Sequence, residues 1–146
     1  MFVTAWMGKF DLSTGKLSFA NAGHNPPLIV HADGECKYLK SKPGFVLAGM
    51  EGMKYRAGSM RLEPGDKIFQ YTDGVTEATN INNELYGMER LGAILNKAKN
   101  GTPHEILPTV KKDIDEFVGE APQFDDITML CLEYKTKMEI KEEDAQ

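Results

Sequence analysis

The spacing of apolar residues changes once along this chain, and that change limits the possible fold more than any other feature. Up to residue 72, short apolar runs alternate with turns rich in Gly, Pro and Asp, which is typical of strands joined as hairpins. Beyond residue 87, apolar residues recur every three or four positions, as they do on one face of a helix. A last apolar run predicts one further strand. This order indicates an α+β domain with antiparallel sheet.

Recognisable turns bound the predicted strands. The segment Asp11–Gly15 predicts a hairpin, and Glu63–Asp66 places Pro and Gly where turn geometry favours them. The first strand is apolar on both of its alternating faces, which predicts that it is covered on both sides. We expect a surface loop at 43–52 and strands at 2–10, 16–22, 28–32, 36–39, 55–62, 67–72 and 127–134.

Two helices are expected between the last two strands. The first covers 88–98 and ends before Gly101. The second begins with a capping box, in which Thr102 is the N-cap and Glu105 reaches back to it. Pro108 falls inside the second helical pattern, where a proline costs about 3 kcal/mol or more, so we expect a kink or a restart there.

Composition excludes several classes of protein. The 146 residues suffice for one domain, and a net charge of −5 argues against a generic nucleic-acid binder. No apolar run is long enough to cross a membrane, and no secretory signal opens the chain. The two cysteines, Cys36 and Cys131, lie in apolar runs. They favour two buried thiols in a reducing cytoplasm, with a disulfide as the alternative.

Carboxylates stand at the ends of two strands that are distant in sequence. Asp73 follows one strand and is itself followed by Gly74, while Asp125 and Asp126 come directly before the last strand. Oxygen ligands of this kind suit Mg²⁺ or Mn²⁺. Asp before Gly is also a common turn, and Asp often opens a strand, so turn and strand-start roles remain the alternative.

Four short motifs occur in a characteristic order, and a fifth segment, 2–5, precedes them. The four motifs are Asn-Ala-Gly-His-Asn-Pro-Pro at 21–27, Thr-Asp-Gly-Val-Thr-Glu-Ala at 72–78, Tyr-Gly-Met-Glu-Arg-Leu at 86–91 and Phe-Asp-Asp-Ile-Thr at 124–128. Four motifs in register are far more specific than any one of them. Together with segment 2–5 they resemble the SpoIIE-like branch of the PPM (type 2C) metal-dependent protein serine/threonine phosphatases, over residues 2–134.

The resemblance implies an antiparallel β-sandwich flanked by helices (α-β-β-α) with a two-metal centre of Mn²⁺ or Mg²⁺. In that family a metal-activated water, rather than a catalytic side chain, attacks the phosphoserine or phosphothreonine. Asp73 and Asp125 match ligand positions, and Asp126 matches the position beside the ligand, although either carboxylate of the pair could turn inward. Gly74 completes the middle motif.

His24 and Asn21 belong to the first motif and are expected to support its loop. We favour a His24 ring that bonds a backbone carbonyl and holds the loop, with a catalytic proton donor as the alternative. Asn21 is expected to satisfy nearby backbone groups in the same way.

One family feature has no counterpart here: the N-terminal Asp-x-x-Gly motif, whose Asp bridges both metals. We therefore expect 1–134 to be the C-terminal portion of a phosphatase domain, incomplete and stabilised little by metal, and 135–146 to be a charged tail. By analogy the substrate is a seryl-phosphorylated regulatory protein of the STAS (anti-anti-sigma) type, in sigma-factor signalling. The alternative is a non-catalytic truncated module that binds partners or forms a homodimer through an exposed sheet.

Overall fold

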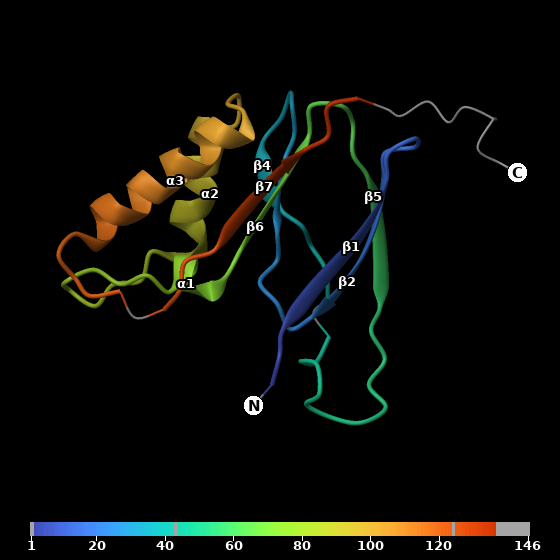
Figure 1. Cartoon of the computed structure of the whole chain (residues 1–146), viewed down its shortest axis with the longest axis horizontal. Coiled ribbons are helices and arrows are strands. Elements are labelled where there is room, and N and C mark those ends of the chain that lie inside the picture. Colours follow the sequence, from blue (N-terminus) through green and yellow to red (C-terminus); the bar gives the residue numbers. More distant parts are fainter. Residues whose placement is uncertain (1, 43, 124, 137–146) are drawn as a thin grey trace, which may run out of the picture. The chain divides into compact units, whose positions relative to one another are not determined.

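The computed structural model describes residues 2–42, 44–123 and 125–136, which form two compact units. The three-stranded unit comprises residues 2–24, 41–66 and 134–136. The helical unit comprises residues 25–40 and 67–133. Each unit contains one antiparallel sheet, and the helices of the described residues all belong to the helical unit (Figure 1).

In the three-stranded unit, β1 (Ala5–Asp11), β2 (Lys16–Ala22) and β5 (Ala57–Arg61) pair in the order β1-β2-β5. The β1–β2 hairpin turns between Asp11 and Gly15, as the sequence predicts. The Gly15 amide donates to the Asp11 carbonyl at 2.8 Å. Gly15 has φ +72°, a left-handed conformation that favours glycine. A Cβ at this position would also lie 2.3 Å from the Leu62 carbonyl oxygen, so the turn has no room for a side chain.

The helical unit has a four-stranded sheet in the order β4-β3-β6-β7. Its helices α2 and α3 are both amphipathic and pack against each other. Helix α2 also contacts β4, and helix α3 contacts β7. The elements are β3 (Leu28–Val30), β4 (Cys36–Tyr38), β6 (Lys67–Tyr71), α1 (Asp73–Thr76), α2 (Gly87–Ala98), α3 (Pro103–Val118) and β7 (Met129–Glu133).

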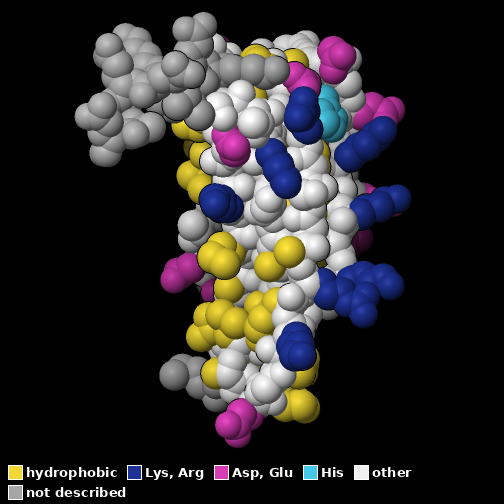
Figure 2. All heavy atoms as spheres, turned by 90° about the vertical axis from the view of Figure 1, so that its right-hand side faces the viewer, with side chains coloured by type: hydrophobic (Ala, Val, Ile, Leu, Met, Phe, Trp, Pro, Cys, Tyr) yellow, Lys and Arg dark blue, Asp and Glu magenta, His cyan; other side chains and the backbone are white. Residues whose placement is uncertain are grey.

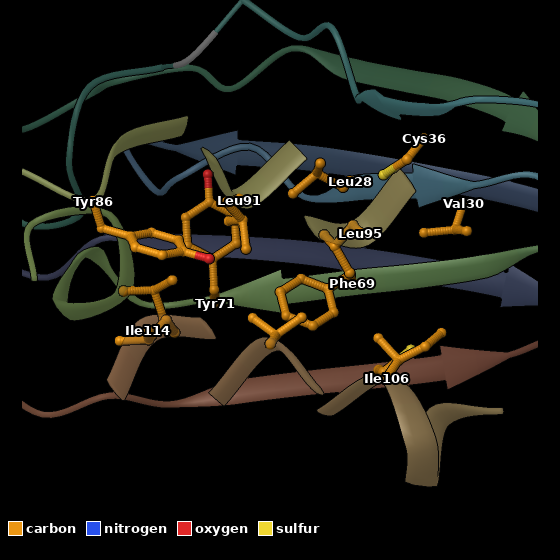
Figure 3. Packing of buried hydrophobic residues seen from close by; sticks show 13 residues of the cluster. Leu28, Val30, Cys36, Phe69, Tyr71, Tyr86, Leu91, Leu95, Ile106 and Ile114 are labelled. Atoms are coloured by element: carbon orange, nitrogen blue, oxygen red, sulfur yellow. The ribbon is translucent and has the colours of Figure 1, made fainter. Parts of the chain in front are cut away.

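A hydrophobic core lies between this sheet and its helices (Figure 3). Its thirteen fully or nearly buried members all belong to the helical unit. The central strand β6 contributes Phe69 and Tyr71, and α2 contributes Leu91 and Leu95. The remaining members are Leu28, Val30, Cys36, Val75, Tyr86, Ile106, Val110, Ile114 and Cys131.

Most predicted elements are confirmed, and two expectations about the first strand are wrong. The first strand begins at Ala5 rather than Phe2, and it is not covered on both sides, since the Met7 side chain is 72% exposed. Helix α1 has no counterpart in the sequence prediction because four residues are too few to show a period. Helix α3 continues through Pro108, so the helix does not restart there, and the alternative of a kink stays a prediction. At this exposed position the proline leaves only the carbonyl four residues earlier without its helical donor.

The capping box of α3 is confirmed. The Thr102 amide donates to the Glu105 carboxylate at 2.7 Å, and the Thr102 hydroxyl donates to the same oxygen at 3.0 Å. Among the described residues, no helix has the length and apolar character that a membrane span requires. The charged tail predicted at 135–146 lies largely outside the described residues, which end at Thr136.

Candidate active site

Two acidic segments, called the acidic loops below, meet at one end of the four-stranded sheet, where β6 ends and β7 begins (Figure 1). They are the turn into helix α1, which carries Asp73, and the loop before β7, which carries Asp125 and Asp126. Thr72 joins them through three hydrogen bonds. Its amide donates to the Thr128 carbonyl at 3.0 Å, and its hydroxyl accepts from the Thr128 amide at 3.1 Å. The same hydroxyl donates to the Asp126 carbonyl at 3.0 Å. Asp73 and Asp125 therefore stand on adjacent backbone segments, although 52 positions separate them in sequence.

Gly74 explains why these loops can approach so closely. A Cβ at Gly74 would lie 2.4 Å from the Asp126 carbonyl oxygen, a separation that real Cβ atoms do not reach. The hydrogen of glycine is the only side chain that leaves this contact intact. The Asp-Gly sequence is thus required by packing between the loops, in addition to its place in a turn.

The carboxylates of both loops are exposed to solvent. Asp73 Oδ1 accepts the Gly74 amide at 3.1 Å, and Asp125 Oδ1 accepts the Asp126 amide at 2.7 Å. These bonds orient each carboxylate on its loop. As hard oxygen donors the two carboxylates suit Mg²⁺ or Mn²⁺. In residues 2–42, 44–123 and 125–136, however, no group of three His, Cys, Asp or Glu side chains is placed to hold a metal ion.

His24 and Asn21 lie together in the three-stranded unit. The Asn21 amide nitrogen donates to the His24 carbonyl at 2.9 Å, and the His24 amide donates to Asn21 Oδ1 at 2.8 Å. The backbone role expected of Asn21 is confirmed. The expected partner of the His24 ring is wrong: its Nδ1 lies 3.0 Å from the Thr4 hydroxyl, and not at a backbone carbonyl. The reason is the register, because Ala5 lies opposite Ala22 and brings Thr4 beside the loop.

Arg90, a residue of the third motif, has a structural role in the helical unit. Its guanidinium forms a two-point ion pair with Asp113, at 2.9 Å and 3.2 Å, and it lies over the rings of Tyr86 and Phe117. The Tyr86 hydroxyl donates to the same carboxylate at 2.6 Å. These hydrogen bonds, that from Arg90 above all, lower the pKa of Asp113. The pairs 86/90 and 113/117 each have the four-residue spacing of one helix face, a signal that could have suggested the contact.

The two cysteines are free and buried, as the sequence favours. Burial raises the pKa of the Cys36 thiol to about 12 and that of Cys131 to about 11. Both side chains therefore remain protonated thiols at neutral pH. Neither has the thiolate character that a nucleophile or a metal ligand needs.

Comparison with known proteins relates this architecture to phosphatases. The model of the family "Stage II sporulation protein E (SpoIIE)" matches residues 1–135. Protein IcfG of Synechocystis is 36% identical over 132 residues, which make up 90% of this chain and 20% of IcfG. Phosphoserine phosphatase RsbU of Bacillus subtilis is 29% identical over 85 residues, or 58% of this chain and 25% of RsbU. The chain thus spans about a fifth to a quarter of these curated relatives.

Among solved structures, the phosphatase domain of Bacillus subtilis SpoIIE aligns with a TM-score of 0.70 at 17% identity, covering 94% of this chain and 59% of that one. The fold is accordingly that of the PPM-type (PP2C) protein phosphatase domains, which confirms the α+β class with antiparallel sheets. Within that class, the chain belongs to the SpoIIE family.

Proposed function

We propose that this chain forms part of a metal-dependent protein serine/threonine phosphatase that hydrolyses phosphoserine on a regulatory protein of the STAS type. The observation that carries the proposal is the junction of the two acidic loops through Thr72, which brings Asp73 and Asp125 to one end of the sheet. Matches to the SpoIIE family model and to the phosphoserine phosphatase RsbU support the reaction class. The name of RsbU also supports phosphoserine as the group attacked.

In this proposal Asp73 and Asp125 would hold Mn²⁺ or Mg²⁺ through their carboxylate oxygens. Such a metal, when bound, would supply activation of a water and stabilisation of charge on the phosphoryl oxygens. Gly74 keeps the two loops in contact, and Asp126 fixes the second loop through its carbonyl and its amide. Asn21 and His24 hold the loop of the first motif in the other unit. The free, buried thiols agree with the reducing cytoplasm as the proposed location.

Metal binding is tested most directly by nuclear magnetic resonance on the 146-residue chain. Paramagnetic Mn²⁺ should broaden the amide signals of Gly74 and Asp126 before any others, because those amides bond the proposed ligands. The variants Asp73→Asn and Asp125→Asn should each raise the Mn²⁺ concentration required, by roughly tenfold or more. Asp33→Asn, at an exposed turn, is the matched control and should change nothing. Broadening centred elsewhere, or unchanged in both variants, would refute the metal assignment.

Hydrolysis is tested with p-nitrophenyl phosphate and the same variants. We expect slow, Mn²⁺-dependent hydrolysis that Asp73→Asn abolishes and Asp33→Asn retains. We also expect millimolar Mn²⁺ to raise the melting temperature little, because a ligand stabilises only as far as its concentration exceeds its dissociation constant. A rise of several degrees would show that the described carboxylates bind metal more tightly than proposed.

A second candidate function is a non-catalytic module that self-associates or binds partners. It is favoured by the lack of a three-ligand group among the described residues and by β1, an edge strand that pairs on one side only in the described sheet. An exposed edge of this kind can pair with a second copy as a homodimer. A cooperative thermal melt without any Mn²⁺-dependent hydrolysis, together with a dimer in sedimentation, would favour this function over the first.

A further inference from the structure

A cavity of about 100 Å³ lies beside the Asp125 loop, within the helical unit. Pockets for complete small-molecule ligands usually enclose about 300–1,000 Å³, so this cavity is sized for a single side chain. Apolar side chains from α3 and from the start of the β7 segment form part of its lining, namely Ile114, Val118 and Ile127.

Acidic side chains line the same cavity. Glu77 follows α1, Asp115 projects from α3, and Asp125 lies in the loop before β7. Glu77 and Asp115 are exposed, and no Lys, Arg or His is among the described residues that line the cavity. Lys111 pairs with Asp115 one helical turn away at 2.5 Å. An exposed ion pair of this kind contributes little to stability, so a better-placed cation can replace it.

We propose that this cavity receives the side chain of a lysine or arginine from a protein partner. Lys and Arg combine an aliphatic stem, which the apolar lining accommodates, with a charged head that remains at a polar rim. Carboxylates at that rim form charge-assisted hydrogen bonds with such a head. The inference rests on the proposed function in one respect: it makes the partner the phosphoprotein substrate, with a basic residue near its phosphoserine.

The test uses the 146-residue chain labelled with ¹⁵N, in EDTA, so that neither metal nor turnover is involved. The probe is a short blocked peptide of alanine and serine with one central arginine. Two control peptides replace the arginine with citrulline, which keeps the shape of the side chain without its charge, or with norleucine, which keeps only the aliphatic stem. We expect the arginine peptide to shift the amide signals of Glu77, Asp115 and Gln123 at a concentration at least fivefold lower than either control peptide requires.

The cavity's own charges are tested by Glu77→Gln combined with Asp115→Asn, which should weaken binding of the arginine peptide at least fivefold. Glu116→Gln is the matched control, because Glu116 is the next residue on α3, is exposed and does not line the cavity. A dispersed amide spectrum verifies that the double variant folds, and Glu77→Gln alone serves if it does not. Asp125 is left unchanged because it belongs to the proposed metal site.

Three outcomes would overturn the proposal: equal binding of all three peptides, shifts centred away from the cavity, or no effect of the charge variants. Equal binding would show an apolar site without charge selectivity. Because metal is absent, failure here leaves the Mn²⁺ measurements on Asp73 and Asp125 unaffected. Conversely, a failed metal assignment with intact arginine binding would leave a basic-peptide site without a phosphatase.

Discussion

The two units of this chain differ in where their hydrophobic side chains are buried and where they are exposed. The helical unit encloses a core of thirteen residues between a sheet and two long helices. No helix occurs in the described residues of the three-stranded unit. Large apolar side chains are exposed on β1, on the segment before it, in the β1–β2 turn and in the loop between β4 and β5 (Figure 2). These exposed side chains are Phe2, Val3, Met7, Leu12, Phe45, Leu47, Met50 and Met53.

The contrast follows from the burial of the strands. In β6, four of five residues are buried, which is typical of a strand inside a covered sheet. In β2 burial alternates along most of the strand, whereas no residue of β1 is fully buried. The central strand β6 is thus largely enclosed, whereas every residue of the edge strand β1 keeps some exposure to solvent.

The largest expected effect comes from removing core volume in the helical unit. Leu95 is fully buried, so Leu95→Ala should lower the free energy of unfolding by about 2–5 kcal/mol. Met7→Ala, at a position 72% exposed in the three-stranded unit, should change it by less than about 0.5 kcal/mol. Urea denaturation of both variants measures the difference. Similar losses of unfolding free energy in the two variants would mean that the difference in burial between the two positions does not affect stability.

A smaller effect is expected from Asp113→Asn, which removes the charged partner of Arg90 in the helical unit. The loss should be about 1 kcal/mol at pH 7, since the pair is only partly buried. Hydrogen bonding lowers the pKa of Asp113, so its contribution is complete above the unfolded pKa of about 3.9. It disappears as the pH falls through the lower, folded pKa. The urea curves of wild type and Asp113→Asn should therefore differ at pH 7 and approach each other at pH 2.5. The control Glu116→Gln should match wild type at pH 7.

The smallest effect is expected at Asp11, in the hairpin turn of the three-stranded unit. Hydrogen bonds from the side chains of Ser13 and Thr14 and from the Ser13 amide lower its pKa to about 2. The ionised Asp11 carboxylate should thus contribute fully to the free energy of unfolding above pH 4, and this contribution should be lost as the pH falls towards 2. Ser13→Ala removes the largest cause and should raise the Asp11 pKa towards 3.8, as read from its carboxyl chemical shift. An unchanged pKa would contradict the hydrogen-bonded turn.

Local features were predictable because they depend on neighbours in sequence. The Asp11–Gly15 turn, the Thr102 capping box and the amphipathic periods of α2 and α3 follow from backbone preferences and spacing alone. The four motifs also predicted the family, which the match over residues 1–135 confirms. The metal role of Asp73, Asp125 and Asp126 stays a prediction.

Other features were fixed only by tertiary structure, because they join residues that are remote in sequence. Thr72 connects the acidic loops across more than 50 positions, and strand register brings Thr4 to the His24 ring. The ion pair between Arg90 and Asp113 forms only because α2 packs on α3. Sequence thus determined most of the elements and the family, through short-range propensities and the order of the motifs. Packing decided which side chains meet, since long-range contacts depend on how strands pair and helices cross.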